Sequence, residues 1–253
     1  PAPIFDIGLH LFHNGKLLEK QQKGIYFYTP KLENYEDALF MNHLFTEGAK
    51  LFNISPTKVK TTVLIETYPA IYQTDEIAHA LKDYIVGLNC GRWDYLYSML
   101  KETDIFLPHK TDLHMQQPFM ESYVRQIVNT CLRRNMYPMG GMSAVLPSKE
   151  EEQNKINLQK IQTDKKIEIE RGCRGAWVAH PDLVQPIQKM FAEHSTNSVS
   201  PNISYPIRKS ELEKIYFTRL PDTKENIRVA LLYISSWLYG VGAVAIDNVM
   251  EDS

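Results

Sequence analysis

The sequence has few cysteines, no long apolar run and almost no net charge. Its three cysteines, Cys90, Cys131 and Cys173, are too few and too scattered for a disulfide framework, which favours a reducing compartment. No apolar stretch is as long as a transmembrane helix, and the first residues lack the basic and apolar regions of a signal peptide. A formal charge of -2 gives no electrostatic basis for binding nucleic acid or a membrane. We therefore expect an intracellular globular protein without either partner.

The chain is long enough to bury a sizeable core, with 253 residues of which 43% are hydrophobic. Its apolar pattern alternates between short strand-like runs and longer helical ones, which is typical of an α/β fold. The predicted strands lie near Ile25, Val63, Ile85, Tyr137 and Trp177. The predicted helices cover residues 4–18, 34–52, 75–82, 96–101, 119–134, 149–171, 182–191 and 226–238.

Two acidic residues follow two of the predicted strands. Glu66 ends the apolar run from Thr61, and Asp94 comes shortly after the run from Tyr84 to Asn89, with one predicted helix between the two strands. Parallel strands joined by a crossover helix end on the same side of a sheet, so the two carboxylates can face one another there. Two hard oxygen ligands fit Mg²⁺. The residues alone also allow two unrelated acids at strand ends.

The segment around these acids resembles a known family. Residues 82–95, which contain Gly-Leu-Asn-Cys-Gly-Arg-Trp-Asp, closely resemble the signature of malate synthase, and Val63-Leu64-Ile65-Glu66-Thr67 resembles the metal-ligand strand before it. The glycine pair Gly140-Gly141 and the Trp-x-Ala-His-Pro stretch that starts at Trp177 are similar to further strand ends of the family. The similarity runs from about Phe5 to Asp252.

The resemblance implies a fold and a reaction. The fold would be a partial (β/α)₈ TIM barrel in residues 1–195, with about the last five strands, followed by the start of a helical C-terminal domain in residues 196–253. The family condenses glyoxylate with acetyl-CoA to give malate and CoA in the glyoxylate cycle. The compartment implied is the cytoplasm, or the peroxisome or glyoxysome.

The resemblance also implies roles for residues of the predicted β-α-β unit. Glu66 and Asp94 would hold Mg²⁺, and the metal would polarise the aldehyde of glyoxylate as a Lewis acid. Backbone N–H groups around Gly91, Arg92 and Trp93 would bind the glyoxylate carboxylate.

Two further roles fall later in the chain. Asp252, within Met250-Glu251-Asp252, would be the catalytic base that removes a proton from the acetyl methyl group. Trp177 would line the pocket.

The sequence also departs from the family. An arginine in an Arg-Pro-Arg-Gly stretch stabilises the enolate oxygen in the family, and no such stretch occurs in these 253 residues. Cys173-Arg174 replaces the usual His-Asp pair, and Tyr84 stands where His or Asn is usual. Five strands cannot close an eight-stranded barrel and leave two open edges, so we expect the chain either to fold poorly alone or to pair with another chain that supplies the missing strands.

Three interpretations remain at this stage. The chain is part of a malate synthase, or a non-catalytic remnant or interaction protein that keeps the fold, or another metal-dependent lyase or aldolase that acts on CoA esters. The Gly-Leu-Asn-x-Gly-x-Trp-Asp match weighs against the third, and we rank the three in the order given.

Overall fold

The computed structural model describes residues 2–143, 145–194, 207–217, 219–247 and 249–252. It divides into two compact units. The first holds Pro1–Thr103 and Asn129–Pro138, and the second holds Asp104–Val128 and Met139–Ser253. The predicted domain boundary at residues 195 and 196 lies outside the described residues.

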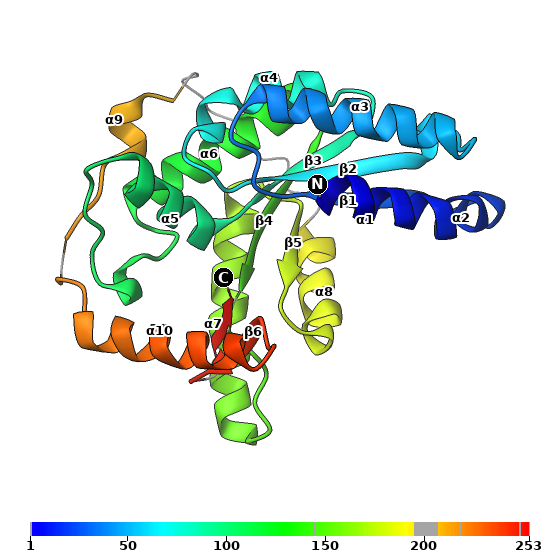
Figure 1. The fold of residues 1–253 in the computed structure, drawn as a ribbon. Helices are drawn as coiled ribbons and strands as arrows, with labels where there is room; N and C mark the ends of the chain where they lie inside the picture. The colour runs from blue at the N-terminus through cyan, green and yellow to red at the C-terminus, as the bar shows by residue number, and fades with distance from the viewer. Residues whose placement is uncertain (1, 144, 195–206, 218, 248, 253) are drawn as a thin grey trace. The chain divides into compact units, whose positions relative to one another are not determined.

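The first unit alternates helices with parallel strands, as the apolar pattern predicted (Figure 1). Its elements are α1 (Ala2–His10), the π-helical turn η1 (Leu11–Gly15), α2 (Lys16–Lys20), β1 (Ile25–Thr29), α3 (Tyr35–Leu51), η2 (Pro56–Lys58), β2 (Val59–Ile65), η3 (Ala70–Gln73), α4 (Thr74–Ala80), β3 (Ile85–Cys90) and α5 (Arg92–Glu102). Helices α3 and α4 contact one another, and Figure 1 shows them together above the strands.

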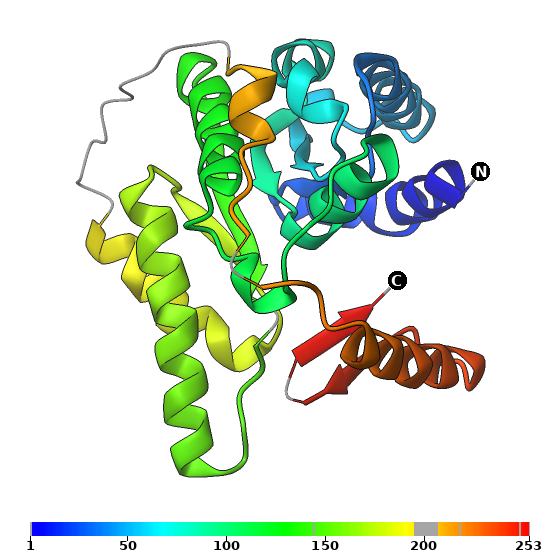
Figure 2. The same cartoon turned by 90° about the vertical axis from the view of Figure 1, so that its left-hand side faces the viewer.

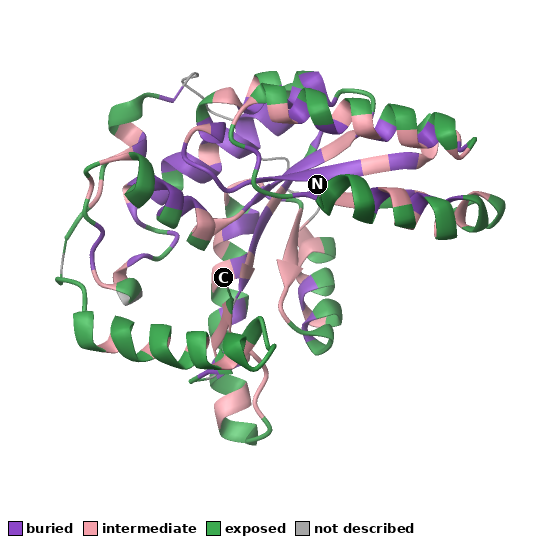
Figure 3. Ribbon diagram, viewed as in Figure 1, coloured by how far each residue is buried: buried purple, intermediate pink, exposed green. Residues whose placement is uncertain are grey.

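Strand β2 lies between β1 and β3 and forms the core of this unit. Its β-branched residues are buried on both faces, which is typical of a central parallel strand (Figure 3). Thr29 pairs with Val63 on one side, and Ile65 pairs with Cys90 on the other. The three strands therefore end at the same edge.

The second unit begins with the turn η4 (Lys110–Asp112). It continues with α6 (Pro118–Arg133), β4 (Tyr137–Ser143), α7 (Glu151–Glu170), β5 (Gly175–Val178), η5 (Pro181–Leu183), α8 (Val184–His194), α9 (Lys209–Leu212), α10 (Thr223–Leu238), β6 (Ala243–Ile246) and β7 (Val249–Asp252). The last residues of α6 and the first of β4 belong to the first unit. Strands β4 and β5 pair in parallel.

The strand order confirms the predicted α/β fold. The five parallel strands follow one another as β1-β2-β3-β4-β5, with helices between them, as in part of a TIM barrel. At Gly87 of β3, a Cβ atom would lie 2.3 Å from the backbone oxygen of Tyr137 at the start of β4, so only glycine permits this approach. Among the described residues, β1 and β5 are the two end strands.

The C-terminal segment is helical in α9 and α10, as expected, but it ends in a hairpin that the sequence analysis did not predict. Strands β6 and β7 are antiparallel and are separated by two residues, the first of which, Asp247, has a φ of 52°. Figure 2 shows the hairpin beside α10, which contacts β6. No described residue of α10 is buried (Figure 3).

Two features of the composition find their structural counterpart. The three cysteines are buried free thiols, so none forms a disulfide. Among the described helices, none combines the length and the apolar character needed to cross a membrane.

Helix α7 carries an ion pair inside the second unit, although its many charges predicted a solvated face. Lys165 is 1% exposed, and its ammonium donates to both carboxylate oxygens of Glu168 at 3.1 and 2.9 Å and to the carbonyl of Gly141. Glu168 also accepts the N–H of Gly141 at 3.2 Å. Burial raises the pKa of Glu168, and Lys165 opposes that shift. The pair therefore fixes the backbone near the end of β4.

We predict that Lys165→Met destabilises the chain by about 3 to 5 kcal/mol, because it leaves the Glu168 carboxylate buried without its cation. The double variant Lys165→Met/Glu168→Met removes both charges and should be less destabilised than the single variant. Urea unfolding measures both. Lys155→Met is the control, since Lys155 forms exposed ion pairs with Glu151 and Glu152 on the same helix. Equal losses for Lys165→Met and Lys155→Met would contradict the prediction.

Candidate active site

The parallel register of β2 and β3 brings Glu66 and Gly91 to the same level of the first unit. Each residue directly follows one member of the pair Ile65 and Cys90. A Cβ atom on Gly91 would lie 2.5 Å from the Cβ of Glu66, so the two segments of backbone are in close contact at this point. The Glu66 side chain is 2% exposed.

Asp94 lies in the first turn of α5 rather than at a strand end. The apolar pattern predicts a helix only from Leu96, but α5 begins at Arg92 with Gly91 at its N-cap position. An aspartate in the first turn is favoured by the partial positive charge of the helix N-terminus, which explains the earlier start. One ammonium, that of Lys31, contacts both Glu66 and Asp94, so the two carboxylates lie near one another.

Lys31 contacts both acids, and the sequence pattern did not single it out. Its ammonium lies 2.6 Å from Asp94 Oδ1 and 3.3 Å from Glu66 Oε1. Its backbone N–H donates to Glu66 Oε1 at 2.9 Å, with the residue held at a φ of 60°. The available signal was the Thr29-Pro30-Lys31 sequence, which leaves β1 at the same edge as Glu66 leaves β2.

Hydrogen bonds fix the loops that carry these residues. The Thr67 hydroxyl donates to the carbonyl of Leu32 at 2.7 Å, which ties the loop after β2 to the loop after β1. The backbone N–H of Tyr68 donates to the hydroxyl of Ser98 on α5 at 2.9 Å. Both hydroxyl-bearing residues are buried. The site is therefore built on supported backbone.

The three charges perturb one another. Burial raises the pKa of Glu66, and the charge of Asp94 raises it further, while Lys31 opposes the shift. Burial disfavours the charged form of Lys31, but its hydrogen bond to Asp94 and the charge of Glu66 outweigh that effect and raise the pKa of Lys31. The site thus holds two acids that repel each other and one cation whose positive charge offsets that repulsion.

The carboxylates fit a divalent metal ion by their chemistry. Both are hard oxygen donors, and the ammonium of Lys31 shows that a single cation can reach both. Among the described residues, no group of three or more His, Cys, Asp or Glu side chains could hold a metal. Two protein carboxylates suit Mg²⁺, which usually keeps several waters and takes further ligands from a substrate.

The residues predicted to bind substrate adjoin these acids. Gly91 is the N-cap of α5, and Arg92 and Trp93 are its first two residues, so all three lie at a helix N-terminus, whose partial positive charge favours an anion. The guanidinium of Arg92 lies over the Trp93 ring at 4.9 Å from its centroid. Trp93 itself is 45% exposed.

Trp177 and Asp252 belong to the second unit. Trp177 lies on β5, is half-buried, and lines a cleft of about 510 Å³ together with Arg174 and residues of α8. Asp252 is the exposed last residue of β7, where it pairs with Ala243. The structure therefore brings Glu66, Asp94 and residues 91–93 together, whereas Trp177 and Asp252 lie in the other unit.

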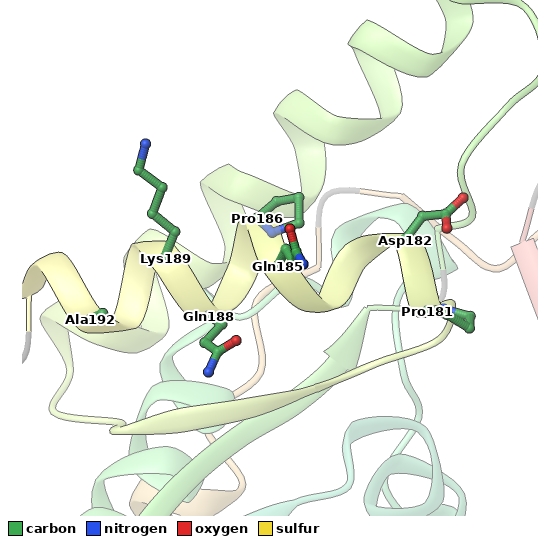
Figure 4. Close-up of a pocket in the computed structure, with 7 residues that line it drawn as sticks. All are labelled: Pro181, Asp182, Gln185, Pro186, Gln188, Lys189 and Ala192. Carbon is green, nitrogen blue, oxygen red and sulfur yellow. The ribbon is translucent and has the colours of Figure 1, made fainter.

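A second cleft, of about 940 Å³, is lined by residues of η5 and α8 in the second unit (Figure 4). Its lining residues are Pro181, Asp182, Gln185, Pro186, Gln188, Lys189 and Ala192. Figure 4 shows the side chains of Lys189 and Asp182 pointing away from the helix. The cleft shares no residue with the predicted site, and it lacks a buried charge.

Comparison with known proteins identifies the family. The model of the malate synthase TIM barrel domain matches residues 1–214, and the model of the malate synthase C-terminal domain matches residues 219–253. The chain belongs to the malate synthase family.

Named relatives agree with this assignment. Malate synthase A of Escherichia coli (strain K12) is 38% identical over all of this chain and 50% of its own length. Malate synthase of Dictyostelium discoideum is 36% identical over 99% of this chain and 49% of its own length, and the glyoxysomal malate synthase of Glycine max is 36% identical over 99% and 47%. The chain thus spans about half the length of these malate synthases.

Among solved structures, the crystal structure of RipC from Yersinia pestis covers 66% of this chain and 63% of that chain. Its TM-score is 0.48 and its sequence identity is 14%, so this likeness carries no argument about function.

We predict that Gly91→Ala displaces the Glu66 carboxylate. The new Cβ would lie 2.5 Å from Glu66 Cβ and 2.9 Å from its Oε2, and the φ of -116° at Gly91 is open to alanine, so the effect is steric. We expect a loss of about 1 to 3 kcal/mol in unfolding free energy. Gly8→Ala on α1 is the control, because a Cβ there meets nothing within 4 Å. Wild-type stability of Gly91→Ala would contradict this packing.

Proposed function

We propose that this chain carries the metal-binding and glyoxylate-binding part of a malate synthase active site. The observation that supports this most is that the Lys31 ammonium contacts both Glu66 and Asp94, which lie in the two segments that resemble the family's metal-ligand strand and its signature. The whole reaction would condense glyoxylate with acetyl-CoA and release malate and CoA.

Glu66 and Asp94 are the proposed metal ligands. When bound, Mg²⁺ would supply Lewis-acid polarisation of the glyoxylate aldehyde. Burial of Glu66 and its contact with Gly91 hold one carboxylate still, while the first turn of α5 orients the other. Fixed carboxylates lose little freedom on binding the metal, which favours affinity.

The N-terminus of α5 is the proposed site for the glyoxylate carboxylate. Its backbone N–H groups near Gly91, Arg92 and Trp93 would donate hydrogen bonds, and the helix dipole adds to the attraction for an anion. This contact would orient the aldehyde carbon for attack by the second substrate.

Asp252 is the proposed base and Trp177 a proposed pocket residue. Asp252 would take a proton from the acetyl methyl group, and the electron pair of that C–H bond would move into the thioester as an enolate. The enolate carbon would form the new bond to the aldehyde carbon. Water would then cleave the thioester, which releases CoA and leaves malate.

A non-catalytic role is the second candidate. The observation that favours it lies inside the region that resembles the family, where Cys173-Arg174 replaces the usual His-Asp pair and changes the charge there. A chain of this kind would keep the metal site and serve as an interaction protein or remnant.

We further propose a domain division, a partner chain and a compartment for this protein. A division into a barrel part at residues 1–195 and a C-terminal part at residues 196–253 follows the polar stretch between them. Strands β1 and β5 end the sheet order, so another chain that supplies strands would pair there. The proposed compartment is intracellular, either the cytoplasm or the peroxisome or glyoxysome, which is consistent with three cysteines that form no disulfide.

CoA release from acetyl-CoA by the purified chain tests the function. We expect release that requires both glyoxylate and Mg²⁺, because neither the aldehyde nor its polarisation can be omitted. Asp252→Asn should lower the rate by about 10² to 10⁴-fold, the usual contribution of a general base. Glu66→Ala should abolish it, whereas Glu76→Ala, which removes an exposed carboxylate from α4, should not change it.

Three results would decide between the candidates. Release that depends on Glu66 and Asp252 supports catalysis. Mg²⁺ binding without any release, in a folded sample, supports the non-catalytic candidate. A folded chain with neither metal binding nor release contradicts the proposed site itself.

A further inference from the structure

Lys31 is the cation that contacts both proposed metal ligands. Its ammonium is 2.6 Å from Asp94 Oδ1 and 3.3 Å from Glu66 Oε1, so it forms ion pairs with the two carboxylates at once. A buried carboxylate beside a second carboxylate needs such a partner, since an unpaired charge in the interior is strongly destabilising. In this arrangement Lys31 supplies the neutralising charge.

The same place cannot serve an ammonium and a divalent metal ion together. Two cations a few ångströms apart repel strongly, and Lys31 already contacts one oxygen atom of each carboxylate that would bind the metal. One cation must leave when the other binds.

We propose that Lys31 is an exchangeable counterion, which pairs with Glu66 and Asp94 in the metal-free chain and withdraws its side chain when Mg²⁺ binds. This inference rests on the proposed metal site and adds to it a competition between the protein's own cation and the metal. The metal affinity of the site is then set partly by Lys31.

The contacts of Lys31 are divided in a way that permits this exchange. Its backbone N–H bond to Glu66 Oε1 does not involve the side chain and can persist when the ammonium leaves. The side chain is 57% exposed and Asp94 is 40% exposed, so the ammonium can reach water without crossing the protein interior. The flexible stem of lysine suits such a movement.

Lys31→Met tests the exchange through metal binding and stability rather than through activity. Without its competitor, Mg²⁺ should bind about tenfold more tightly by calorimetric titration, after allowance for solvent screening of the exposed ammonium. Without its counterion, the metal-free chain should melt about 3 to 6 °C lower. Added Mg²⁺ should therefore raise the melting temperature more in the variant than in the wild type.

Lys101→Met is the matched control. Lys101 is an exposed lysine on α5 that pairs with Glu33 and Glu102, so the variant removes the same charge from the same unit without touching Glu66 or Asp94. It should keep the wild-type metal affinity and melting temperature. Glu66→Ala and Asp94→Ala should lose Mg²⁺ binding, both alone and in combination with Lys31→Met.

A second measurement needs no variant. Reductive methylation of the wild-type chain, followed by peptide mass spectrometry, reports how freely each lysine amine reacts. Saturating Mg²⁺ should speed modification of Lys31 severalfold and leave Lys101 unchanged. This test holds even if Lys31→Met fails to fold.

The outcomes separate the two proposals. Wild-type binding that needs Glu66 and Asp94, together with an unchanged or weaker affinity in Lys31→Met or an unchanged reactivity of Lys31, would overturn the exchange and leave the metal site in place. Absence of Mg²⁺ binding by folded wild-type and Lys31→Met chains would overturn both.

Discussion

The site depends on the need of a buried carboxylate for a cation. Glu66 is almost fully buried, and Asp94 adds a second negative charge beside it. Water is excluded from Glu66, although Asp94 is 40% exposed, so a positive charge within contact distance stabilises the buried carboxylate. In this structure Lys31 meets that need, and the positions of the loops after β1 and β2 follow from it.

The backbone makes the meeting of these charges inevitable once the strands pair. The register of β1 with β2 and of β2 with β3 places Lys31, Glu66 and Gly91 at one edge. Gly91 lets α5 begin beside Glu66, and α5 then carries Asp94 in its first turn. A metal bound here would need no dedicated cage, because two consecutive β-α units each place one carboxylate at this edge.

Much of this arrangement could be predicted from the sequence. The apolar runs near Val63 and Ile85 gave both strands, and the acids after them gave the candidate ligands. Lys31 could not be found in this way, because a lysine after Pro30 is typical of a surface loop and its role arises from strand register. The hairpin after α10 and the buried charge of Lys165 could not be predicted for a related reason. Two short apolar runs do not indicate that they will pair with each other, and a charge-rich helix does not indicate which of its charges will be buried.

The most direct test of the site at Glu66 and Asp94 is a crystal structure determined from crystals grown with Mn²⁺ in place of Mg²⁺. Anomalous scattering would locate the metal. If Glu66 and Asp94 are the ligands and Lys31 their exchangeable counterion, an anomalous peak should lie within about 2.3 Å of an oxygen from each carboxylate, near the distances of hard-cation ligands. The Lys31 ammonium should then have left both carboxylates. A well-ordered structure from Mn²⁺-saturated crystals, with no peak at these oxygens and with Lys31 still paired to them, would contradict the metal site.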